Sequence, residues 1–232
     1  LYIGKNKEAT EAELQQLRAF SEIHKKYIVK PAYAAFGKGV HMDSLDAYPS
    51  VGEAFEAYAQ HGSVLEELIE QGEEMALIHP QSVNTLRIPT AVIKGEDGQP
   101  QVRLFNPTIR VGQKDSVIDN FSAGGISALI DPDTGLIFSD GADKKGRAYK
   151  LHPDTGVAFK GFRIPHWDEA VSMVSQAAMM VPGNHYCGWD LAYTARHGWC
   201  MVEANCTAQM GGMQMVTKTG RRWELEELIS KM

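Results

Sequence analysis

The sequence has only three cysteines, Cys187, Cys200 and Cys206, and no two of them show the Cys-x-x-Cys spacing of zinc and redox motifs. Their odd number and their spacing indicate neither a disulfide framework nor a cysteine-based zinc site. We therefore expect free thiols that serve core packing in a reducing, cytoplasmic compartment.

Long hydrophobic runs and basic tracts are also missing. No apolar stretch approaches the roughly 18 residues of a membrane-spanning helix, and no signal peptide is present. The net charge is −6 and no basic tract is available to neutralise a phosphate backbone, so we expect neither a membrane span nor nucleic acid as a partner. Because the chain starts at Leu1 rather than Met and leads directly into a helical pattern, we expect a further domain upstream.

Apolar residues repeat at helical spacing in some segments and alternate as in strands in others. Helices are expected at about 8–26, 50–60, 73–78, 167–180 and 223–232, and strands at about 27–30, 64–69, 85–94, 102–111, 123–131, 136–138, 189–194 and 198–205. This order predicts an α+β fold with antiparallel sheets rather than a parallel crossover fold.

The most informative segments are Trp189–Thr194 and Gly198–Asn205, which alternate like strands and are separated by a turn. They should form an antiparallel hairpin. Glu203 and Asn205 are two residues apart, so their side chains lie on one face of the strand, and Asp190 on the partner strand can face the same point.

These three oxygen-bearing side chains have no histidine or thiolate beside them, which is typical of a magnesium site that leaves positions for phosphate oxygens. The alternative is that they are simply solvated. The apolar neighbours in both strands argue that the hairpin is buried on at least one face, where unpaired carboxylates are costly.

Lys30 ends an apolar strand and precedes a loop with Gly37-Lys38-Gly39. An ammonium group beside flexible backbone amides can hold nucleotide phosphates, although an ordinary strand-to-helix turn explains the same pattern. Glu66 and Glu67 lie in an apolar strand with Glu73 shortly after it, where backbone groups could bind adenine and a carboxylate could bind ribose. The alternative is an edge strand with solvent-facing glutamates.

Arg87 lies between two apolar residues of a strand, and Arg110 lies in the following strand region. Each is a candidate for binding an anionic substrate, together with the Gly124-Gly125 turn. A structural salt bridge is an equally good interpretation of either arginine.

These parts follow one another as a lysine and glycine loop, an acidic strand, an arginine strand, and then Asp190, Glu203 and Asn205. This order resembles the ATP-grasp superfamily over about residues 27–212. More narrowly, Val83–Ile88 and Asp119–Ile126 resemble the sugar-transfer-associated ATP-grasp group. The resemblance implies two α+β lobes with antiparallel sheets that clasp ATP, placed here at 1–80 and 81–232. A further phosphate-binding lysine and a preceding substrate-binding domain, usual in the superfamily, have no counterpart in this sequence.

Residue roles follow from the resemblance alone. It implies that Lys30 contacts ATP phosphates and that Gly37, Lys38 and Gly39 form the phosphate-covering loop. It implies adenine contacts from the backbone of Glu67, Leu68 and Ile69, with Glu66 beside them and Glu73 on the ribose. Asp190, Glu203 and Asn205 become the magnesium ligands, with Glu203 bridging two ions, while Arg87 and Arg110 are the candidate catalytic residues.

The activity that the resemblance implies is an ATP- and Mg²⁺-dependent carboxylate–amine ligase that acts through an acyl phosphate. Its substrates would be a small carboxylate and an amine, and its setting surface-polysaccharide or peptide-conjugate biosynthesis. Two alternatives stay open: a phosphotransferase acting on a sugar or small alcohol, and a nucleotide-binding domain without turnover.

Overall fold

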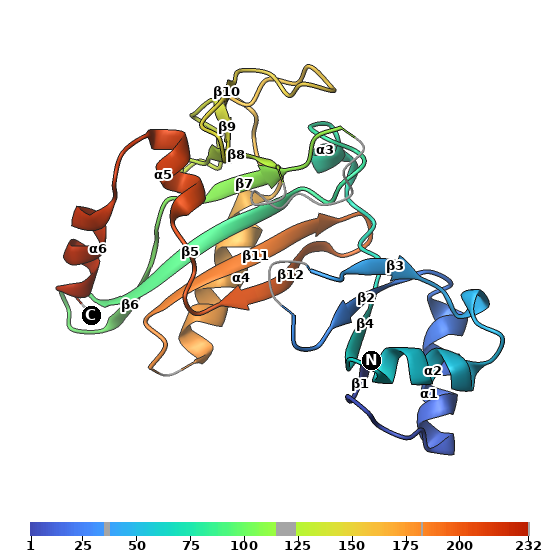
Figure 1. Cartoon of the computed structure of the whole chain (residues 1–232). Coiled ribbons are helices and arrows are strands. Elements are labelled where there is room, and N and C mark those ends of the chain that lie inside the picture. The colour runs from blue at the N-terminus through green and yellow to red at the C-terminus, as the bar shows by residue number, and fades with distance from the viewer. Residues whose placement is uncertain (35–37, 115–123, 182, 232) are drawn as a thin grey trace. The chain divides into compact units, whose positions relative to one another are not determined.

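The computed structural model describes residues 1–34, 38–114, 124–181 and 183–231, which form two compact units, Leu1–Ile69 and Glu70–Met232 (Figure 1). Both units combine helices with antiparallel sheets, so the predicted α+β class is confirmed. None of the described helices is long and apolar enough to cross a membrane.

The first unit is a four-stranded antiparallel sheet with two main helices. The strand order is β1-β4-β2-β3. Its elements are β1 (Tyr2–Ile3), α1 (Glu11–Ile23), β2 (Tyr27–Pro31), β3 (His41–Asp43), the short 3₁₀ helix η1 (Leu45–Ala47), α2 (Val51–Ala59) and β4 (Ser63–Glu67). Its core joins Leu17 of α1 and Phe55 of α2 to Tyr27 and Leu65 of the sheet.

Local sequence fixes both helix starts. Thr10 caps α1 by accepting from the Glu13 backbone N–H, and the Glu13 side chain reaches back to Thr10, which completes a capping box. Ser50 accepts from the Glu53 backbone N–H in the same way at the start of α2.

The second unit is built on a sheet of eight strands in the order β10-β9-β8-β7-β5-β11-β12, with β6 paired to β5. Its strands are β5 (Thr85–Lys94), β6 (Pro100–Leu104), β7 (Thr108–Val111), β8 (Ile126–Leu129), β9 (Gly141–Asp143), β10 (Ala148–Tyr149), β11 (Tyr186–Thr194) and β12 (Gly198–Asn205). Its helices are α3 (Glu73–Ala76), α4 (Trp167–Met180), α5 (Gly211–Thr217) and α6 (Arg222–Ile229).

The two faces of this sheet differ in character. Leu86 and Leu191 belong to the face that α4 covers, and they share a core with Val174 of that helix. Alternate residues point the other way. On that second face, Met213 of α5 and Leu228 of α6 pack with other apolar residues, while Arg87, Asp190 and their neighbours supply polar side chains.

The boundary between the units lies between Ile69 and Glu70, not after residue 80 as expected. The reason is packing of the intervening residues with the second unit. The Gln71 side chain donates to the backbone oxygens of His79 and Ser82, both at 3.1 Å. Gly72 N–H donates to the backbone oxygen of Tyr193 at 2.8 Å.

Some strand predictions were only partly right. The expected strand at 102–111 is two strands, β6 and β7, because Asn106 takes a left-handed φ of 44° and Pro107 follows it. The segment 136–138 makes only isolated bridges, Ile130 with Ile137 and Leu136 with Arg163. Helix α5 was not predicted, because two glycines at its start conceal a helical pattern of seven residues.

Candidate nucleotide and magnesium site

Two arginines and one aspartate form a buried ion-pair cluster on the polar face of the second unit's sheet. Arg87 Nε donates to Asp190 Oδ1, and Arg87 Nη2 donates to Asp190 Oδ2 at 2.9 Å. Arg110 Nη2 lies 3.0 Å from the same Oδ2 and also donates to Thr85 Oγ1 at 2.8 Å. The Asp190 side chain is only 6% exposed, so this carboxylate depends on both guanidinium groups.

The strand register produces this cluster. Arg87 of β5 is directly opposite Asp190 of β11, and Arg110 of β7 is opposite Thr85 of β5. Residues paired in this way share a face of the sheet. Burial alone would lower the pKa of Arg87, but hydrogen bonding and the charge of Asp190 outweigh it, and the pKa is raised. The arginine therefore stays charged.

Glu203 and Asn205 lie on the same face, on the outer strand β12. Asp190 is paired with Glu203 and Gly188 with Asn205, as the predicted hairpin requires. Glu203 is exposed, and its charge also favours the charged form of Arg87, so the pKa of that arginine is raised further. The Asn205 Nδ2 atom is buried without a hydrogen-bond partner among the described residues, so no such bond fixes its amide.

These residues fit a magnesium ion that shares its ligands with phosphate. All three offer hard oxygens for the ion. The unpartnered Nδ2 of Asn205 is a hydrogen-bond donor, so it suits a phosphate oxygen beside the ion rather than the ion itself. A carboxylate has about four lone-pair directions, and the arginines already use three of those on Asp190. Among the described residues no group of three or more His, Cys, Asp or Glu is placed to hold a metal. The donor set therefore suits an ion held jointly with a ligand rather than a closed protein cage.

In the first unit, Lys30 of β2 is ion-paired to Glu66 of β4. Their side chains are 34% and 44% exposed, so the pair is weak and Lys30 can exchange it for another anion. Glu67 ends β4, and the backbone N–H of Leu65 two residues earlier donates to Leu1, away from β2. Backbone N–H and C=O groups alternate in direction along a strand, so those of Glu67, like those of Leu65, point away from β2.

The remaining candidates stand at the ends of elements. Leu68 and Ile69 follow β4 outside regular structure, and Glu73 is exposed at the start of α3. Gly37 lies outside the described residues, while Lys38 is exposed. Gly39 has a φ of 76°, and a Cβ there would come within 2.8 Å of the Pro31 ring, so only glycine fits this turn.

The model of the family described as sugar-transfer associated ATP-grasp matches residues 1–229. The chain belongs to this family. The predicted superfamily and its subgroup are thereby confirmed. No curated protein matches the chain.

Solved ATP-grasp proteins share the fold at low sequence identity. D-alanyl-alanine synthetase A from Vibrio cholerae superposes with a TM-score of 0.51 at 11% identity, over 100% of this chain and 59% of that one. The ATP-grasp ligase PsnB, complexed with minimal precursor, Mg and ADP, gives a TM-score of 0.54 at 16% identity, over 94% of this chain and 50% of that one. N5-carboxyaminoimidazole synthetase from Staphylococcus aureus, complexed with ADP, gives a TM-score of 0.51 at 10% identity, over 93% of this chain and 42% of that one. The chain spans about half the length of these ATP-grasp proteins.

One residue beside the ATP-grasp candidates was missed from the sequence. Gly188 lies on the same face as Asp190, and a Cβ there would come within 2.4 Å of Ala208 and 3.0 Å of the Arg87 side chain. The glycine lets the segment after β12 cross the sheet close to Arg87. The available signal was a glycine immediately before the predicted strand 189–194, two residues before the aspartate.

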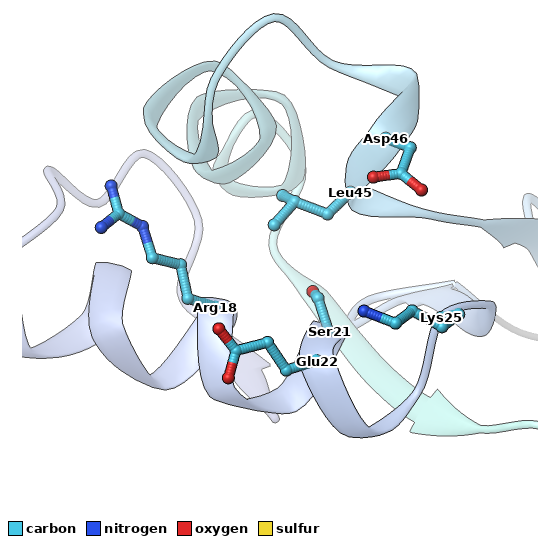
Figure 2. A pocket seen from close by; sticks show the side chains of 6 residues that line it. All are labelled: Arg18, Ser21, Glu22, Lys25, Leu45 and Asp46. Atoms are coloured by element: carbon cyan, nitrogen blue, oxygen red, sulfur yellow. The ribbon is translucent and has the colours of Figure 1, made fainter.

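Two pockets among the described residues contain none of these candidate residues. Figure 2 shows one of about 100 Å³ in the first unit, where Arg18, Ser21, Glu22 and Lys25 of the α1 region face Leu45 and Asp46. The other, of about 300 Å³, lies in the second unit near β9 and the end of α5. Neither pocket contains Arg87, Asp190 or Arg110, so neither is the predicted site.

Proposed function

We propose that the protein containing this chain is an ATP- and Mg²⁺-dependent carboxylate–amine ligase that acts through an acyl phosphate. The observation that carries the proposal is the pair of buried arginines on Asp190. Asp190 is paired directly with Glu203, and the next residue on that face of β12 is Asn205 with its unpartnered Nδ2. Membership of the ATP-grasp family supports it, and a protein of the same fold has been solved with Mg and ADP.

The second unit would hold the reacting phosphates. Glu203 and Asn205 would supply the principal magnesium ligands, with Asp190 adding its remaining lone pair. Bound magnesium supplies positive charge to the β- and γ-phosphates. Arg87 and Arg110 have fixed guanidinium groups, and such pre-positioned cations stabilise charge that shifts during phosphoryl transfer without needing to reorganise.

The first unit would bind the rest of the nucleotide. Lys30 would leave Glu66 for a phosphate, and Lys38 and Gly39 with Gly37 would approach the phosphates through backbone amides. The backbone of Glu67, Leu68 and Ile69 would bind adenine, and Glu73, at the start of the second unit's α3, would bind the ribose. The ligase substrates would be a small carboxylate and an amine, in surface-polysaccharide or peptide-conjugate biosynthesis.

Magnesium-dependent stabilisation by ATP tests this function in the full-length protein. At a hundredfold excess of MgATP over its dissociation constant, we expect about 2.7 kcal/mol of stabilisation, measured as a rise in Tm. ATP with excess EDTA should give much less, because Glu203 and Asn205 then lack the ion that joins them to the phosphates.

A matched pair of variants sharpens the test. Asn205→Ala should lose most of the magnesium-dependent part of the shift, whereas Gln99→Ala, an exposed amide residue in the β5–β6 turn, should keep it. An equal shift with and without divalent ions would show that these residues do not form the metal site.

A further inference from the structure

Two cysteines meet at the end of the β11–β12 hairpin. Gly188 pairs with Asn205 at the last position of β12, and the next residues outward are Cys187 of β11 and Cys206 in the turn after β12. Facing residues of antiparallel strands have Cα atoms about 4.5–5.5 Å apart, and a chain that continues this spacing stays within the range of about 4.4–6.8 Å that a disulfide needs.

Side-chain interactions agree with this placement. Besides burial, the neighbouring Cys206 thiol raises the pKa of Cys187, while a hydrogen bond to the Asn184 side chain lowers it. Asn184 Nδ2 donates to Cys206 Sγ at 3.5 Å. Three polar groups therefore gather where the outer strand ends.

The two thiols differ in access to solvent. Cys206 is exposed, whereas Cys187 is 2% exposed and packs in the core under α4. Burial raises the pKa of the Cys187 thiol. Cys206 is therefore the thiol that a reagent in solution meets first, and Cys187 is the thiol that can react with it afterwards.

We propose that Cys187 and Cys206 form a reversible disulfide by exchange with a low-molecular-weight disulfide. The Cys206 thiolate attacks one sulfur of that disulfide and releases one small thiolate. The Cys187 thiolate then attacks Cys206 Sγ and releases the second. The two cysteines are oxidised, the small disulfide is reduced to two thiols, and the two protons lost by the cysteines pass to the released thiolates.

The disulfide acts on the neighbouring candidate ligand, a consequence that rests on the proposed function. Asn205 immediately precedes Cys206 and points to the opposite face. An S–S bond of about 2.05 Å replaces a longer non-covalent contact, so it draws the end of β12 towards β11 and shifts Asn205. Magnesium tolerates little departure from octahedral geometry, so oxidation weakens MgATP binding.

The disulfide itself is tested by incubating the full-length protein in a series of glutathione buffers with a rising share of the oxidised form. Free thiols are then alkylated and the peptides identified by mass spectrometry. We expect a peptide linking Cys187 to Cys206 that increases with oxidised glutathione and disappears with dithiothreitol. Cys200→Ser should retain it and the exposed Cys206→Ser should lose it. A protein that carries only glutathione on Cys206, or links Cys206 to Cys200, overturns the inference.

The effect on the site is measured separately as MgATP affinity in the oxidised and reduced states. We expect about tenfold weaker binding after oxidation, the size typical of disturbing a metal ligand's support, and no difference in Cys206→Ser. Equal affinity in both states overturns the link to Asn205. Absence of MgATP binding in both states overturns the proposed function, while the linked peptide still supports the cysteine pair.

Discussion

At the residue scale, Asp190 shows how a buried charge is held in this protein. Its two oxygens receive three bonds from Arg87 and Arg110, and all three side chains are largely shielded from water. A charge at this depth is tolerated because its partners come from neighbouring strands of one rigid sheet. The same rigidity prepares both arginines to meet an anion.

Asp190→Asn should be strongly destabilising, because it leaves two buried guanidinium groups close together without a counter-charge. We expect the free energy of unfolding to fall by about 3–5 kcal/mol, measured by urea denaturation. Glu203→Gln is the control, since Glu203 is exposed and its loss should change stability little. Equal stability of the Asp190→Asn variant and the wild type would contradict the geometry of the cluster.

Lys30→Met and Glu203→Gln should separate binding from turnover. Lys30 offers charge to phosphates present in the ground state, so its loss should weaken ATP affinity. Glu203 acts where charge moves in the transition state, so its loss should mainly lower kcat. Affinity and turnover of full-length variants are the measurements, with the exposed Lys26→Met as control. Wild-type affinity in Lys30→Met together with wild-type turnover in Glu203→Gln would refute these roles.

At the element scale, local sequence patterns predicted those helices and strands whose spacing of apolar residues is visible within the element itself. The hairpin of β11 and β12 was found from alternation alone, and α4 from apolar spacing. The pairing of Arg87 and Arg110 with Asp190 could not be assigned, because an alternating pattern shows the face of a side chain but not the neighbouring strand. Gly188 was missed for a related reason, since its close contact comes from a later segment.

A network of buried histidines supports the end of β7. His152 Nε2 lies 2.9 Å from the Gly112 backbone oxygen, and Asp154 N–H donates to His152 Nδ1 at 3.3 Å, so the neutral ring satisfies both contacts. The ring lies against His79, with the Asp154 carboxylate nearby. Desolvation is the main reason that the pKa of His152 is lowered, and His79 adds to it.

Acid should therefore weaken the second unit. The unfolded chain takes up a proton on His152 below about pH 6.5, while the folded form does so only at lower pH, so stability is lost as pH falls through this window. We expect the urea midpoint to decrease between about pH 7 and about pH 5. His152→Gln should show a smaller pH dependence and the exposed His197→Gln the same dependence as the wild type. An unchanged pH dependence in His152→Gln would contradict the account.

At the scale of the whole molecule, the order of lysine, acidic strand, arginine strand and acidic hairpin predicted the family that the comparison confirmed. The boundary between the units was placed too late, because the hydrogen bonds of Gln71 that join residues 70–80 to the second unit are not visible in a local pattern. Each unit carries its own share of the proposed site residues.

The most direct test of the ligase proposal is ADP release by the full-length protein with MgATP and panels of small carboxylates and amines. We predict ADP only when a carboxylate and an amine are both supplied, and its loss in Glu203→Gln but not in Glu96→Gln. ADP formed with a sugar or alcohol alone would contradict the ligase assignment in favour of a phosphotransferase. MgATP binding without ADP under any combination would instead identify a nucleotide-binding domain without turnover.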